Sequence, residues 1–122
     1  MTLAERCDAI EECYEFMLAY AAQGLADDAG SSAGANVREF LRKAAKALEG
    51  IAGICAGEGI PPDFTAVLER DAASSLAAVH MVLAQRAISS QLIDNLNASI
   101  HLRALLTDLF VIDEVLKIKA TA

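Results

Sequence analysis

Two histidines are the residues whose type and spacing first suggest chemistry. His80 and His101 are the only histidines in the sequence, and a turn expected near residue 88 would make their helices antiparallel neighbours. In that pairing the two rings would lie within about one helical turn of each other. Such a pair could bind a metal ion or the iron of haem. Because two ligands alone rarely make a metal site, the simpler interpretation is two surface rings that contact solvent or a carboxylate, Asp94 or Asp108.

Two known uses of helical histidines can be compared with the neighbouring residues. The di-iron signature of ferritin-like bundles requires a Glu three residues before each of two histidines, whereas Ala77 and Ala98 hold those positions here. Histidine phosphotransfer domains are acidic four-helix chains in which a Lys and a Gly follow the active histidine. Leu102 and Arg103 follow His101, so the chain is similar to that family at the level of fold only. A phosphotransfer-like or other enzyme is the third alternative, and no catalytic residue is assigned.

Three cysteines form a second group with potential chemistry. Cys7 and Cys55 are expected in one layer at the end of a helical hairpin, where a redox bond or a metal site is conceivable, while Cys13 lies on another face. The sequence contains neither a CxxC motif nor a zinc-ligand set. Such cysteines are more often small packed side chains with a raised pKa. An odd number of them is typical of a reducing cytoplasm. The sequence predicts packing roles and a cytoplasmic location, and it leaves the pairing of Cys7 and Cys55 open.

The charge of the chain restricts the class of partner. The formal net charge is −7 and the isoelectric point is near 4.7. An acidic surface repels phosphate backbones, so we expect no nucleic-acid binding. The first residues carry acids where a signal peptide would need a basic start, which predicts no secretory segment. Acidic residues also form a stripe on the first helix at Glu5, Asp8, Glu12 and Glu15. This stripe could dock a basic partner, although such a run is usually the solvated face of a helix.

The composition favours helices that pack closely in one domain, residues 1–122. Hydrophobic residues make up 55% of the chain but aromatic residues only 5%, so Ala, Leu, Ile and Val supply most of the apolar mass. Capping boxes at Thr2 with Glu5 and at Asn36 with Glu39 begin the first two helices. The expected helices are Leu3 to about Gly24, Asn36 to about Gly57, Pro62 to about Arg86, and Gln91 to about Lys117. They predict an antiparallel, up-down-up-down four-helix bundle with a mobile first loop at residues 27–34.

The register of the first two helices can be derived from their apolar spacing. Both helices have apolar residues at alternating spacings of four and three, which is typical of a bundle seam. When the two seams are aligned from the loop outward, Met17 faces Ala44 and the last layer pairs Cys7 with Cys55. The spacing therefore predicts an antiparallel hairpin in this register.

The segment Ile100 to Leu116 is the most apolar part of the sequence. Its apolar residues cover most of the helix circumference, so one broad stripe packed in a bundle would not hide them all. The uncharged run is far shorter than the roughly 18 residues that a membrane span needs, and we expect no membrane insertion. The surplus surface predicts a homodimer, or docking onto another protein, through this last helix. The expected interface residues are Leu102, Leu105, Leu109, Ile112 and Leu116.

These observations leave three classes of function. The first is a non-enzymatic interaction protein, such as an adaptor, a small accessory subunit or a chaperone-like partner, which uses the surplus apolar face. The second is a binder of a small apolar ligand, a haem or a metal ion between the small-residue segment Ala72–Ala78 and the two histidines, although no cofactor is specifically indicated. An enzyme is the third. A concave pocket that gathers His101, Asp108 or Tyr14 would support it.

Overall fold

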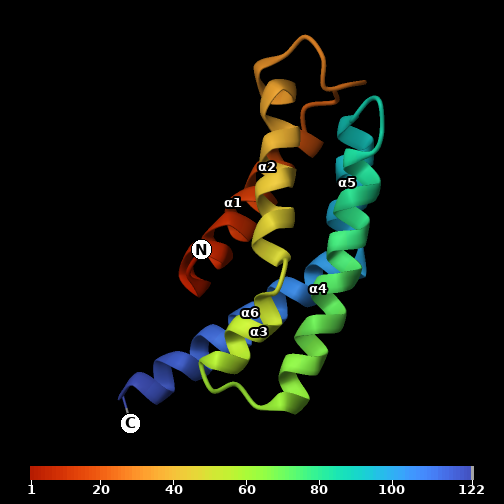
Figure 1. The fold of residues 1–122 in the computed structure, drawn as a ribbon. Helices are drawn as coiled ribbons and strands as arrows, with labels where there is room; N and C mark the ends of the chain where they lie inside the picture. Colours follow the sequence, from red (N-terminus) through yellow and green to blue (C-terminus); the bar gives the residue numbers. More distant parts are fainter. Residues whose placement is uncertain (122) are drawn as a thin grey trace.

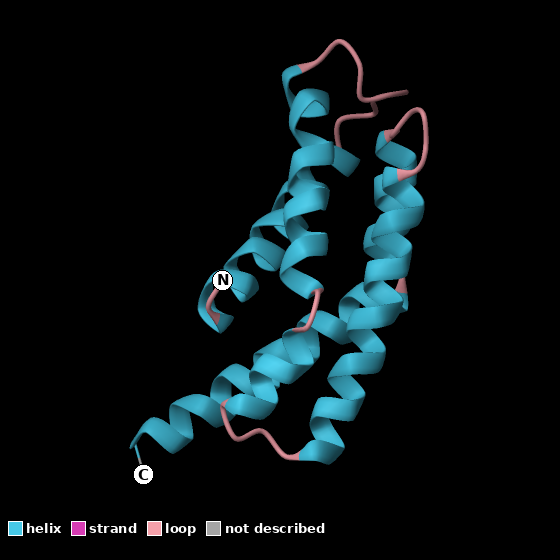
Figure 2. Cartoon of the chain, in the orientation of Figure 1, coloured by secondary structure: helices cyan, strands magenta, loops and turns pink. Residues whose placement is uncertain are grey.

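Six helices follow one another along residues 1–121, which the computed structural model describes, and no strand lies among them (Figures 1 and 2). They are α1 (Leu3–Ala21), α2 (Ser32–Leu48), α3 (Ile51–Gly57), α4 (Pro62–Leu83), α5 (Ser90–Ala98) and α6 (Ile100–Thr121). The predicted all-α class is confirmed. The chain is a packed helical domain, but the second and fourth predicted helices are each divided into two.

The helix starts agree with the sequence at three places and differ at one. At α1 the Thr2 hydroxyl accepts a hydrogen bond from the Glu5 amide at 3.1 Å, and the Glu5 carboxylate accepts one from the Thr2 amide at 3.3 Å, so the predicted capping box is confirmed. The α4 start at Pro62 also agrees, and α5 begins at Ser90, one residue before the expected Gln91, with Ser89 as its N-cap. The capping box predicted at Asn36 is wrong. Ser31, a favourable N-cap residue nearer the loop, accepts from the Gly34 amide and starts α2 earlier.

The division between α2 and α3 lies at Gly50. This glycine has a φ of 71°, which lies in the left-handed region. Left-handed backbone often ends a helix, and glycine adopts it without strain. The Arg6 guanidinium donates hydrogen bonds to the carbonyls of Ala47 and Glu49, which replace the intrahelical bonds lost at the end of α2. The short α3 then packs on α4 instead of continuing along α1.

The division between α5 and α6 lies at Ser99, whose ψ of 138° is extended. No proline or glycine marks this position in the sequence. The two helices have different partners, because α5 packs mainly on α1 whereas α6 packs mainly on α4. One straight helix could not follow both directions, so the break allows each segment to bury its own apolar face.

Helices α1 and α2 are antiparallel neighbours (Figure 1), but their register differs from the predicted one. The rings of Phe16 and Phe40 stack with centroids 4.3 Å apart, whereas the predicted register places residue 45 opposite Phe16. Arg6 contacts the carbonyl of Ala47 at 3.0 Å. Both contacts fit a pairing displaced by about one heptad. A seam with spacings of four and three looks the same after such a shift, so spacing alone could not distinguish the two registers.

A polar network ties the first loop to the α4–α5 turn. Asp28 forms an ion pair with Arg38 at 2.7 Å and accepts a hydrogen bond from the Ile88 amide at 2.9 Å. The buried Tyr20 hydroxyl donates to the Ile88 carbonyl at 2.7 Å, and the Ser90 hydroxyl donates to the Tyr20 carbonyl at 2.7 Å. The loop that the sequence predicts to be mobile is therefore anchored through side chains from three helices.

The apolar core includes side chains from all six helices. The largest fully buried side chains in it are Tyr20, Met17, Leu41, Ile51, Leu68, Ile88, Ile93 and Leu105. None of the helices within residues 1–121 combines the length and the apolar character that a membrane span requires.

Candidate functional site

A groove separates α1 from α6 because each helix packs mainly on other elements, α1 on α2 and α5, and α6 on α4. It consists of two adjoining hollows of about 400 and 490 Å³ that share Glu11. One hollow contains Leu3 and Leu116, and the other contains Tyr14 and Arg103. The two helices therefore run antiparallel along this α1–α6 groove.

The floor of the α1–α6 groove is apolar. Its deepest side chains come from α6, where Leu109 and Ile112 are 3% and 2% exposed. Tyr14 is half-buried in the wall, and Phe110 is 54% exposed at the edge of α6. Leu18, one turn beyond Tyr14 on α1, is 49% exposed. The apolar surface thus continues from the buried floor onto side chains that no part of residues 1–121 covers.

Acidic side chains form the rims of the same groove. They are Asp8, Glu11 and Glu15 on α1, Glu58 after α3, and Asp113 on α6. Partial burial, and then the nearby charges of Asp8, Asp113 and Glu15, raise the pKa of Glu11 above its ordinary value. Arg103 is the one cation among the described residues that line the two hollows. The rims therefore repel one another electrostatically and would attract a positively charged ligand.

The structure uses most of the predicted interface residues inside the chain itself. Four of them are 5% exposed or less, namely Leu102, Leu105, Leu109 and Ile112, and Leu116 is half-buried in the α1–α6 groove. The exposed apolar side chains of α6 are instead Ile100, Phe110, Val111 and Ile118. A helix that is apolar on every side gives no sequence signal for which side faces its own core. Exposed apolar side chains remain on α6 at positions other than the predicted ones, and an interface formed by this helix stays a prediction.

The two histidines are placed on the surface and away from the groove. His80 is exposed in the last turn of α4, and His101 is exposed in the first turn of α6. Within residues 1–121 neither ring takes part in a hydrogen bond or an ion pair. No group of three or more His, Cys, Asp or Glu side chains among those residues has the geometry to hold a metal ion. Within the described residues the pair therefore gains no third His, Cys, Asp or Glu ligand that would complete a metal site.

The three cysteines are free thiols. Cys13 and Cys55 are buried, and Cys7 is half-buried in the α1–α6 groove. Burial raises the pKa of Cys13 to about 12, and burial together with the neighbouring Cys55 and Glu11 raises the pKa of Cys7 to about 11. A thiol that stays protonated is a weak nucleophile and a poor metal ligand. Their geometry is that of small packed side chains.

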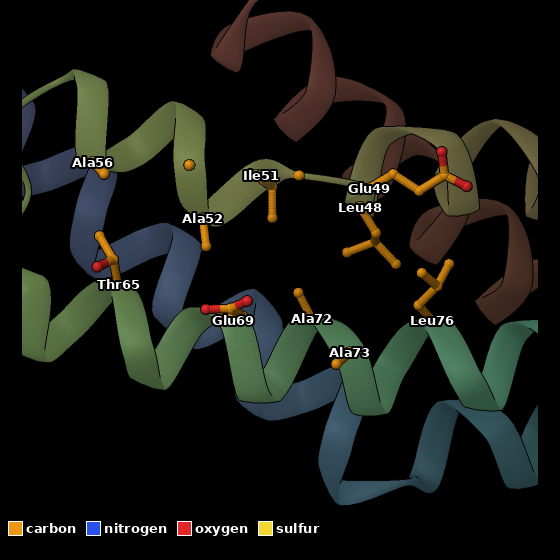
Figure 3. A pocket seen from close by; sticks show the side chains of 12 residues that line it. Leu48, Glu49, Ile51, Ala52, Ala56, Thr65, Glu69, Ala72, Ala73 and Leu76 are labelled. Carbon is orange, nitrogen blue, oxygen red and sulfur yellow. The ribbon is translucent and has the colours of Figure 1, made fainter.

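A second groove lies between the α2–α3 junction and α4, and it has a volume of about 460 Å³ (Figure 3). Ala72, which belongs to the small-residue segment where the second function class places a ligand, lines this groove with its small side chain. Figure 3 shows Leu48 and Leu76 facing each other at one end, and Thr65 and Glu69 on the α4 side of the rest. Neither histidine lines this groove.

One pair of carboxyl groups was not anticipated from the sequence. Asp108 of α6 is 8% exposed and lies beside Asp71 of α4. Burial, and then the contact with Asp71, raises the pKa of Asp108 to about 7. Its Oδ2 atom has no hydrogen-bond donor among the described residues, which is the environment of a carboxyl group that keeps its proton. No ion pair joins Asp108 to His101 in the described structure, and Asp108 lines neither groove.

The sequence contained a signal for the buried Asp108, but not for its partner. Asp108 interrupts an apolar run and shares a helical face with the buried Leu105 and Ile112. That position on a packed face indicates a buried carboxyl group. The signal does not reveal that Asp71 of another helix is its neighbour.

No protein-family model matches the chain, and comparisons with curated proteins and with solved structures found no significant match. The features of the chain that indicate a function are therefore the α1–α6 groove, its apolar floor and its acidic rims.

Proposed function

We propose that the protein is a non-enzymatic interaction protein that holds a helix of another protein in the α1–α6 groove. The observation that carries this proposal is the continuous apolar surface from the buried Leu109 to the exposed Phe110, which the described chain leaves uncovered. An adaptor, a small accessory subunit or a chaperone-like partner would each use such a surface.

The dimensions of the groove suit a short helix. Its α1 wall extends from Leu3 to Glu15, which corresponds to about 18 Å, or about three helical turns. The groove between two antiparallel helices can accommodate a third helix, whose apolar residues at successive turns pack against both walls. Half-buried Tyr14 and exposed Phe110 would become fully covered by such a partner.

The charge favours a different protein over a second copy of this chain. Each copy carries a formal net charge of −7. Two copies joined groove to groove would bring Asp8, Glu11 and Glu15 against the same acids of the other copy. Like charges that face each other across an interface are strongly unfavourable. A partner of another sequence avoids this repulsion.

The proposal can be tested with a peptide probe and amide chemical shifts. The probe is a helical peptide of about 14 residues with Leu along one face and Gln on the others, and a scrambled peptide of the same composition is the control. In the isotope-labelled full chain, we expect the probe to shift the amides of Tyr14 and Phe110 but not that of Met81, which is 65% exposed on α4. Shifts confined to the groove between α3 and α4, or equal shifts from the scrambled peptide, would contradict the proposal.

A further inference from the structure

We infer that the helix held in the α1–α6 groove carries Lys or Arg along its flanks and runs parallel to α1, with its amino end beside Asp8 and Glu58. This inference rests on the proposed docking function and adds the charge and the direction of the partner helix.

Charge is distributed unevenly along the groove. The hollow at the start of α1 is lined by Asp8, Glu11, Glu58 and Asp113, and no basic side chain of the described chain lines it. The hollow farther along α1 contains Arg103 together with Glu11 and Glu15. The groove therefore has a strongly acidic end and an end where one cation offsets part of the negative charge.

Most of this acidic charge is not neutralised by other side chains of the described chain. Asp113 forms an ion pair with Lys117 at 3.0 Å. Asp8, Glu11 and Glu58 take part in no ion pair among residues 1–121. Partial burial and acidic neighbours already raise the pKa of Glu11, so its ionised form is disfavoured in the unoccupied groove. A partner cation would remove that repulsion at the moment of binding, which gives a cationic flank a selective advantage over a neutral one.

The charges at the two ends of the groove determine the direction of the partner helix. The amino end of a helix carries a partial positive charge and free N–H donors, and the carboxyl end carries a partial negative charge. The amino end is therefore stabilised next to Asp8 and Glu58, and the carboxyl end next to Arg103. Because Asp8 lies near the start of α1 and Arg103 lies opposite Tyr14, farther along it, this arrangement makes the partner parallel to α1 and antiparallel to α6.

A charge series tests the first part of the inference. Three peptides share one Leu face and differ only in their flanks, which are Lys, Gln or Glu, and their dissociation constants are measured with the full chain at low and high salt. We expect the Lys peptide to bind about tenfold more tightly than the Gln peptide at low salt, the Glu peptide to bind most weakly, and salt to reduce the differences. Equal affinities would overturn the inference but leave the docking function intact. Failure of all three to bind would overturn both.

Matched variants test whether the preference for the Lys peptide arises from the rim of the groove. Glu11→Gln removes a rim charge, whereas Glu12→Gln removes an exposed charge from the same helix outside the groove lining. We expect Glu11→Gln to weaken binding of the Lys peptide by about threefold and to leave the Gln peptide unchanged, while Glu12→Gln changes neither affinity by more than experimental error. An equal effect of the two substitutions would contradict a specific role for the rim.

The direction is tested with the Lys peptide capped at both ends and carrying a nitroxide at one of them. A label at the amino end should broaden the amide signals of Cys7 and Glu58, and a label at the carboxyl end should broaden those of Tyr14 and Arg103. The opposite pattern, or equal broadening from both ends, would overturn the predicted direction without affecting the charge series.

Discussion

At the scale of single residues, long polar side chains hold the ends of helices by bonding to carbonyls far away in the chain. The Arg38 guanidinium of α2 donates to the carbonyl of Leu83, the last residue of α4, at 3.1 Å, and to the carbonyls of Gln85 and Arg86 in the following turn at 2.8 and 3.2 Å. It also forms the ion pair with Asp28. The last carbonyls of a helix have no intrahelical donors, so a planar group with several N–H donors is well suited to this position.

Replacing Arg38 should therefore destabilise the fold. We expect Arg38→Ala to lower the free energy of unfolding by about 2 kcal/mol, because three carbonyls and one carboxylate lose a charged donor. Arg42→Ala, at an exposed position one turn later in α2, is the matched control and should change stability by less than about 0.5 kcal/mol. Urea denaturation measures both. Equal losses in the two variants would refute the capping role of Arg38.

The buried carboxyl group of Asp108 predicts a pH dependence of stability with a definite sign. The pKa of folded Asp108 is raised to about 7 by burial and by Asp71, so the folded chain binds a proton that the unfolded chain releases near pH 4. The contribution of Asp108 to stability is therefore fully present below about pH 4, falls as the pH rises, and is lost above about pH 7.

Asp108→Asn removes this titration while keeping the shape of the side chain. We expect the variant to be more stable than the wild type at pH 8, by on the order of 2 kcal/mol, and nearly equal to it at pH 4. Asp94→Asn, at an exposed position on α5, should leave the pH profile unchanged. Denaturant unfolding measured from pH 4 to pH 8 makes the comparison, and a wild-type profile retained by Asp108→Asn would show that the pair does not share a proton.

At the scale of helices, two interruptions determine which elements meet. The left-handed Gly50 directs α3 onto α4, and the extended Ser99 directs α6 away from α5. Since α5 is the segment that packs on α1, α6 only borders α1 and leaves the α1–α6 groove open.

The conformation of Gly50 can be tested by a pair of substitutions with opposite signs. Gly50→Ala places a side chain at a φ of 71° and should lower the free energy of unfolding by about 1 kcal/mol. Gly53→Ala lies inside α3, where an added Cβ meets open space, and should raise it by about 0.5 kcal/mol. Thermal unfolding of both variants provides the measurement. Stabilisation by Gly50→Ala would mean that α2 continues through this position.

The sequence predicted elements better than it predicted their relations. The capping signal at Thr2 and the proline at Pro62 are local, and they correctly placed the starts of α1 and α4. The break at Ser99 depends on which helices α5 and α6 contact, so no local residue type announced it. The register of α1 and α2 was ambiguous because a heptad pattern repeats itself.

The residues of the candidate site could likewise be predicted in part from the sequence, whereas their arrangement in space could not. The sequence identified the acidic stripe at Asp8 and Glu15 and the surplus of apolar residues in the last helix. It could not show that these two features border one groove, because that requires α6 to run alongside α1. Phe110 was therefore missed as an exposed residue, and Leu105 was expected on the surface although the core encloses it completely.

At the scale of the whole molecule, shape and charge favour the same kind of partner. The first and last of the described helices, α1 and α6, border the groove. The formal net charge of −7 opposes self-association through acidic surfaces and accelerates encounters with basic ones. In a groove with an apolar floor and acidic rims, burial of apolar surface provides affinity and charge provides selectivity.

The dissociation constant of the Lys-flanked peptide for two matched variants tests the central claim most directly. Phe110→Ser removes an apolar side chain from the edge of the α1–α6 groove without changing its charge, and Met81→Ser makes a similar change at an exposed position on α4. Loss of apolar contact at the groove edge should weaken binding to Phe110→Ser by about tenfold or more, while Met81→Ser binds like the wild type. Equal affinities of the two variants would mean that the α1–α6 groove is not where a partner helix docks.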